Sequence, residues 1–124
     1  MTAYLVERAE QQIRSLGLNE YRQFVFDFTG QIESTDTIDD VTGTDSHGNT
    51  LGVADDDSAL TIGTVAIAGT SITVDRRTVA ANKAVTAFIG PGTAEEGDTH
   101  TVRCRAVTGT GQTVELVGYI RLEQ

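Results

Sequence analysis

Residues that branch at the β-carbon dominate this chain. Thr, Val and Ile occur 19, 12 and 8 times, so they make up nearly a third of the 124 residues. Such side chains lose rotamer freedom in helices and pack well on pleated surfaces. The 13 glycines favour tight turns between short strands. We therefore expect a mainly β protein in which helix takes a minor share.

Short segments of alternating polarity recur along the chain. The clearest are 22–28, whose alternation places three phenylalanines on one face, and the pair 99–107 and 113–122 near the C-terminus. About seven short strands at this spacing predict an immunoglobulin-like β-sandwich, here without that family's disulfide and buried Trp. The other expected strands are 51–53, 59–67, 71–75 and 84–89.

The last two expected strands predict a hairpin with defined faces. Alternation places Cys104 on the inward face, where a thiol behaves as a small apolar group. Arg103 and Arg105 lie on the opposite face of the same strand. We expect one of them to pair across the hairpin with Glu115 or Glu123.

One segment departs from the strand pattern. Apolar residues recur at helical spacing between residues 3 and 16, and Thr2 and Gly17 suit the two caps of an amphipathic α-helix. We expect an N-terminal docking helix at 1–17 and the sandwich at 18–124. A helix this short is marginal in water, so its apolar stripe needs its own sandwich or a neighbouring subunit to lie on. The candidate partner-binding residues are Leu5, Ala9, Ile13 and Leu16.

The charge balance excludes several classes of partner. With 18 acidic and 9 basic residues, the formal net charge is −9. Nucleic acids and anionic membranes both attract basic surfaces, so we expect neither as a partner. No apolar run approaches the ~20 residues of a membrane span. The single cysteine excludes an intrachain disulfide and fits folding in a reducing cytoplasm.

The sequence shows no arrangement typical of an active site or a metal site. The polar stretch 39–58 is acidic, but a calcium loop counted from Asp45 has Thr50 where a glycine belongs. His47 and His100 are far apart, and we interpret them as a loop histidine and a strand-edge histidine. No Gly-x-Ser-x-Gly elbow is present. We expect a solvated polar loop at 39–58, no catalytic residues, no cofactor and no metal.

Four segments together resemble a known family. FDF at 26–28 and ESTDTI at 33–38 resemble an aromatic-Asp-aromatic strand followed by an Asp-Thr-Ile turn. AFIGPGTAEEG at 87–97 resembles a strand that ends in a glycine-rich corner, and TVRCRAVTGTGQ at 101–112 resembles the strand that follows it. The arrangement is similar to small immunoglobulin-like virion proteins of tailed bacteriophages, particularly the fibre-to-tail adaptor family. The likeness covers roughly residues 24–122.

The resemblance implies a non-enzymatic structural protein, made in the host cytoplasm and located in the virion. Its partners would be tail, fibre or capsid subunits, in a homo-oligomeric or otherwise symmetric assembly. A capsid decoration (cement) protein that stabilises the head shell is the alternative within this class. A carbohydrate-binding module is a further alternative. For that role the available tyrosines are Tyr4, Tyr21 and Tyr119.

Overall fold

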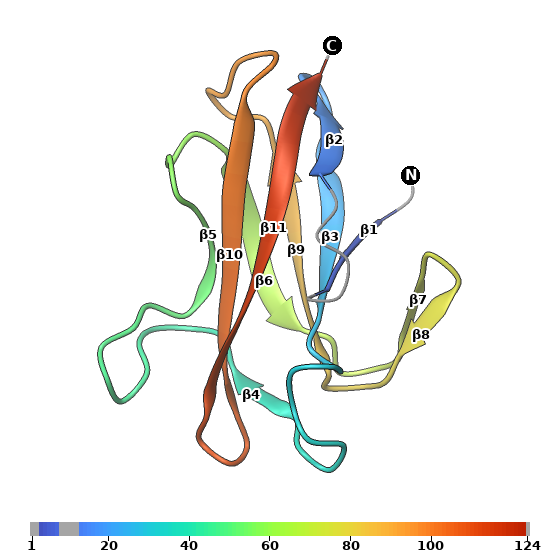
Figure 1. The fold of residues 1–124 in the computed structure, drawn as a ribbon, viewed down its shortest axis with the longest axis vertical. Helices are drawn as coiled ribbons and strands as arrows, with labels where there is room; N and C mark the ends of the chain where they lie inside the picture. Colours follow the sequence, from blue (N-terminus) through green and yellow to red (C-terminus); the bar gives the residue numbers. More distant parts are fainter. Residues whose placement is uncertain (1–2, 8–12, 124) are drawn as a thin grey trace.

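The protein is a β-sandwich. The computed structural model describes residues 3–7 and 13–123, and over this part of the chain it contains eleven β-strands and no helix (Figure 1). Nine of these strands form two sheets that enclose a common core, and the other two form a separate hairpin. Within the same residues, nothing helical is long and apolar enough to cross a membrane.

The first sheet has four strands in the order β1-β3-β9-β6. Strands β3, β9 and β6 are antiparallel neighbours, whereas β1 lies parallel to β3 at one edge. Their bounds are β1 Tyr4–Val6, β3 Arg22–Asp27, β6 Thr61–Ile67 and β9 Ala84–Gly90.

The second sheet has five strands, with the long hairpin β10–β11 at its centre. Strand β2 lies parallel to β11 on one side, and β4 and β5 both pair with β10 on the other. The bounds are β2 Ile13–Gly17, β4 Ile38–Asp40, β5 Gly52–Asp55, β10 Thr99–Thr108 and β11 Thr113–Glu123. This sheet confirms the expected C-terminal hairpin, and both Arg103 and Arg105 pair with Glu115.

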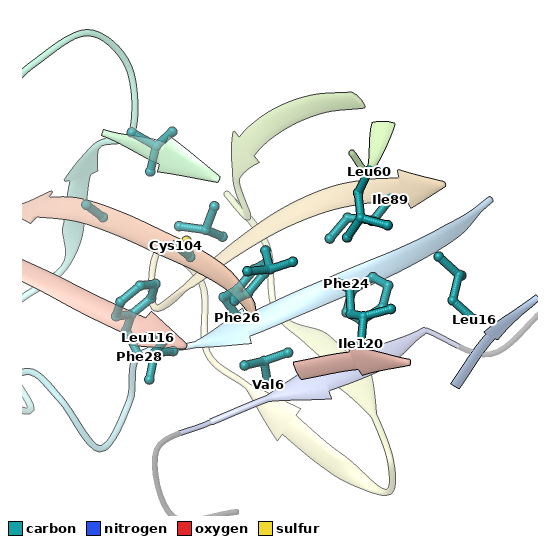
Figure 2. Close-up of a cluster of buried hydrophobic side chains, with 14 of the residues drawn as sticks. Val6, Leu16, Phe24, Phe26, Phe28, Leu60, Ile89, Cys104, Leu116 and Ile120 are labelled. Atoms are coloured by element: carbon teal, nitrogen blue, oxygen red, sulfur yellow. The ribbon is translucent and has the colours of Figure 1, made fainter. Parts of the chain in front are cut away.

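The core lies between the two sheets (Figure 2). The alternation in 22–28 is confirmed, because its three phenylalanines are all buried on the inner face of the first sheet. They pack with buried side chains of the facing sheet, including the thiol of Cys104. The central residues are Phe24, Phe26, Phe28, Ile89, Leu116, Ile120 and Leu122.

A smaller apolar cluster lies outside the first sheet. The hairpin of β7 (Ile72–Val74) and β8 (Arg77–Val79) folds against β3 and covers Val25, which is fully buried. Leu5 of β1 belongs to the same cluster. Both faces of β3 are therefore covered by apolar side chains.

The predicted N-terminal α-helix is wrong for the residues that the structure describes. Residues on either side of 8–12 form β1 in the first sheet and β2 in the second. Leu5 pairs with Val25, and Leu16 pairs with Leu122. This part of the chain contributes an edge strand to each sheet.

Backbone pairing and burial explain this outcome. Without β1 and β2, the edges of β3 and β11 would have unpaired amide and carbonyl groups, which are costly to leave without partners. Two strands satisfy those groups and bury Leu5 and Leu16, whereas an isolated four-turn helix is marginal in water. Apolar residues spaced three or four apart do not distinguish one helix from two short strands in different sheets.

We expect Leu16→Ala to destabilise the protein by about 2–5 kcal/mol, because Leu16 is 0% exposed in the main core. Ile13 lies on the same strand but is 58% exposed. Ile13→Ala is therefore the matched control and should change stability by less than about 0.5 kcal/mol. Urea unfolding of both variants measures the difference. Equal effects of the two substitutions would contradict the strand assignment.

Candidate functional site

The four predicted docking residues do not form one exposed stripe. Leu5 and Leu16 are buried within their own domain, at 6% and 0% exposure. Ile13 is exposed on the edge strand β2, and Ala9 lies outside the described residues. In this fold, Leu5 and Leu16 stabilise the sandwich and are not available to a partner.

One end of the sandwich holds a buried carboxylate between two segments that are far apart in the sequence. The Thr110 hydroxyl, in the β10–β11 turn, donates a hydrogen bond of 2.7 Å to Asp36 Oδ2. The Thr37 amide donates to Asp36 Oδ1 at 2.9 Å, and the Gly109 amide donates to the Thr37 carbonyl at 2.9 Å. Chiefly because of the Thr110 hydrogen bond, the pKa of Asp36 lies below its ordinary value. We call this arrangement the Asp36–Thr110 contact.

Lys83 forms hydrogen bonds to the turn before β4, on the side away from the β10–β11 turn. The Lys83 ammonium donates to the Ser34 carbonyl at 2.8 Å and also to the Asp36 carbonyl. The Ile38 amide donates to the Asn82 carbonyl at 2.8 Å. Residues 33–38 are thus held between the β10–β11 turn and the segment that leads into β9.

The polar loop that follows β4 is organised by Asp45. Its carboxylate accepts hydrogen bonds from the amides of His47 and Asn49, both at 2.8 Å, and from the Thr113 hydroxyl at 2.6 Å. Hydrogen bonds from the Thr113 and Asn49 side chains, in that order, are the main reasons that the pKa of Asp45 is lowered. The Asp45 carboxylate therefore connects the polar loop after β4 to the start of β11.

The opposite end of the sandwich holds a group that the sequence analysis did not bring together. His100, at the start of β10, is 4% exposed. Its Nδ1 lies 3.3 Å from Asp55 Oδ2 and 3.3 Å from Asp57 Oδ2, and its Nε2 lies 3.8 Å from Asp98 Oδ2. Neither ring nitrogen has a hydrogen-bond partner of acceptable geometry. We call Asp55, Asp57 and His100 the His100 cluster.

Asp55 is the buried carboxylate of this cluster. Its Oδ2 accepts hydrogen bonds from the amides of Ala59 and Leu60, each at 2.9 Å, and its Oδ1 accepts one from the Asp57 amide at 3.1 Å. Burial raises the pKa of Asp55, but these amides and the charge of His100 together hold the pKa below its ordinary value. The carboxylate is therefore ionised and fixed in position.

The pairing of β5 with β10 brings the cluster together. Asp55 pairs with Val102, so the end of β5 and the loop after it lie beside the first residues of β10. The sequence shows two aspartates, Asp55 and Asp57, at the end of an expected strand, but it does not show the register between β5 and β10. Sequence reasoning treated His100 as a single strand-edge residue for this reason.

A cavity of about 630 Å³ lies near the end of β3 and the start of β8. Its charged groups pair with one another, because the Arg77 guanidinium pairs with Glu7 and lies 3.4 Å from Asp27. Asp27 also accepts hydrogen bonds from the Thr29 amide at 2.9 Å and the Thr29 hydroxyl at 2.6 Å. These groups support the loop after β3.

Comparisons with protein-family models, with curated proteins and with solved structures found no match for this chain.

The Asp36–Thr110 contact predicts a pH-dependent stability difference. Because the folded-state pKa of Asp36 is lowered, its contribution is present above the ordinary value of 3.8 and is lost as the pH falls through the folded-state pKa. Thr110→Val removes the main cause of that shift. We expect this variant to be less stable than the parent at pH 7, with a difference that shrinks as the pH falls below 3.8.

Urea unfolding at pH 7 and at about pH 3 measures this difference between parent and variant. The control is the same substitution in an Asp36→Asn background, where the effect of Thr110→Val should no longer depend on pH. A destabilisation by Thr110→Val that is equal at both pH values would contradict the assigned role of Asp36.

Proposed function

We propose that this chain is a non-enzymatic structural protein of a bacteriophage virion, an adaptor that joins tail fibres to the tail. The proposal rests on the resemblance over residues 24–122. It assigns the protein a role in assembly, with tail and fibre subunits as partners.

The observation that carries this proposal is the Asp36–Thr110 contact. The turn at 33–38 and the segment at 101–112 both carry the resemblance, and they are hydrogen-bonded to each other through Asp36, Thr37, Gly109 and Thr110. Motif residues of two separate segments thus make one physical unit at one end of the sandwich. A rigid loop surface of this kind suits a protein that holds a partner in a fixed orientation.

The strand order supports an immunoglobulin-like fold as part of the proposal. The order β1-β3-β9-β6 corresponds to strands A, B, E and D of that fold, and β11, β10 and β5 correspond to G, F and C. The parallel pairing of β1 with β3 differs from the antiparallel sheets of that fold. We propose a variant of the immunoglobulin-like sandwich in which the N-terminal strands are rearranged.

The chemistry of the potential nucleophiles also favours an assembly role. Cys104 is fully buried, and burial raises the pKa of its thiol, which suppresses the reactive thiolate. Ser46 Oγ lies 3.3 Å from Nδ1 of its neighbour His47, in an exposed loop.

With Leu5 and Leu16 buried, we assign partner contacts to the loops and outer faces of the sandwich.

The proposal predicts a small copy number in the particle. Quantitative mass spectrometry of purified virions, with the major capsid protein as internal standard, measures this number. An adaptor should be present at a few to about a dozen copies, because it follows the symmetry of the tail. Particles made without the protein should retain tails and lack fibres, and the same protein supplied in trans should restore the fibres.

Other results would replace the adaptor role. A copy number comparable to that of the capsid protein would identify a capsid decoration protein. Absence from the virion would contradict both structural roles and favour a carbohydrate-binding module. Its surface would then be the exposed pair Tyr21 and Phe88, whose rings stack with centroids 5.4 Å apart. Tyr4 is less suited, because the Arg22 guanidinium lies over its ring at 4.3 Å.

A further inference from the structure

We infer that Asp55, Asp57 and His100 form a binding site for a divalent transition-metal ion of the zinc class. Each side chain offers one donor atom, and the three donor atoms all lie within 4.8 Å of one another. The inference is independent of the proposed adaptor role, because it depends only on the geometry of this cluster.

The spacing of the donor atoms fits tetrahedral coordination. Metal–ligand bonds of about 2.0–2.1 Å at tetrahedral angles place neighbouring ligand atoms about 3.3–3.4 Å apart. His100 Nδ1 lies 3.3 Å from Asp55 Oδ2 and 3.3 Å from Asp57 Oδ2. Two of the three distances between donor atoms thus already match those around such an ion, and the third lies within 4.8 Å.

The donor set favours one class of metal. Calcium and magnesium take oxygen ligands, whereas an imidazole nitrogen beside carboxylates suits zinc and similar transition metals. Three protein donors leave one tetrahedral position for water. The ion can reach the site from solvent, because the Asp57 side chain is 65% exposed.

The state of His100 points independently to a ligand. Its side chain is 5% exposed, yet neither ring nitrogen has a hydrogen-bond partner. Buried polar atoms without partners are costly and rare in folded proteins. A metal on Nδ1 would satisfy that atom, whereas Nε2 lies 3.8 Å from Asp98 Oδ2, beyond hydrogen-bond distance.

Outer-shell hydrogen bonds are present at Asp55. The amides of Ala59 and Leu60 both donate to Asp55 Oδ2, and the Asp57 amide donates to Asp55 Oδ1. These hydrogen bonds fix the orientation of the Asp55 carboxylate, and Oδ1, which accepts one of them, keeps a lone pair for a metal ion. A bound ion would link the loop after β5 to the start of β10, at the end of the sandwich opposite to the Asp36–Thr110 contact (Figure 1).

The test is Zn²⁺ binding to the full chain after treatment with a chelator. We expect isothermal titration calorimetry to show one saturable site and added Zn²⁺ to raise the Tm, because an ion that binds only the folded state stabilises it. Co²⁺ in place of Zn²⁺ should give the intense visible absorption of a tetrahedral site. Absence of saturable Zn²⁺ binding would overturn the inference.

Substitutions test whether Zn²⁺ binds at the His100 cluster. Asp57→Asn changes an exposed side chain and should weaken Zn²⁺ binding by at least about tenfold, and His100→Gln should abolish it. The matched controls are Asp56→Asn, next to Asp57 but paired with Arg103, and His47→Gln at the other histidine. Both controls should bind Zn²⁺ like the parent. Binding that survives Asp57→Asn unchanged, or that is lost in His47→Gln, would overturn the inference.

Discussion

The structure depends on the three phenylalanines of the β3 segment, which fill the space between the two sheets. Phe24, Phe26 and Phe28 lie on one face and contact the inner face of the β10–β11 sheet. The chain has no tryptophan, and its other aromatic residues are exposed or partly exposed, so aromatic burial in the core comes mainly from this segment. Its position determines where β9 and the N-terminal strand β1 can pair.

The N-terminal strands complete this core. β1 and β2 belong to different sheets, and side chains join them directly. The Tyr4 hydroxyl donates a hydrogen bond of 2.7 Å to the Ser15 carbonyl, and the Arg14 guanidinium donates to the Leu5 carbonyl at 3.1 Å. The segment expected to reach a partner instead connects the two halves of its own domain.

Where local alternation decides the structure, the sequence was a sufficient guide. It predicted the buried face of 22–28 and the inward position of Cys104, both of which depend on a period of two. It also predicted that Arg103 or Arg105 would pair with Glu115 or Glu123, and in the structure both arginines pair with Glu115. The prediction for the N-terminal segment was wrong because its apolar spacing fits one helix and two strands equally well. The sheet edges that need a pairing strand decide between these two structures. The His100 cluster was not predicted from the sequence for a related reason. It depends on the register between β5 and β10, which neither strand specifies alone.

The central claim is that the N-terminal segment is part of the sandwich and not a docking helix. The most direct measurement is solution NMR of the free protein, with backbone ¹³Cα shifts for residues 3–7 and 13–17 and cross-strand NOEs between Leu16 and Leu122. We expect strand-like shifts and NOEs that match the parallel pairing of β2 with β11. Helical shifts through these residues, with no contact to Leu122, would contradict the account.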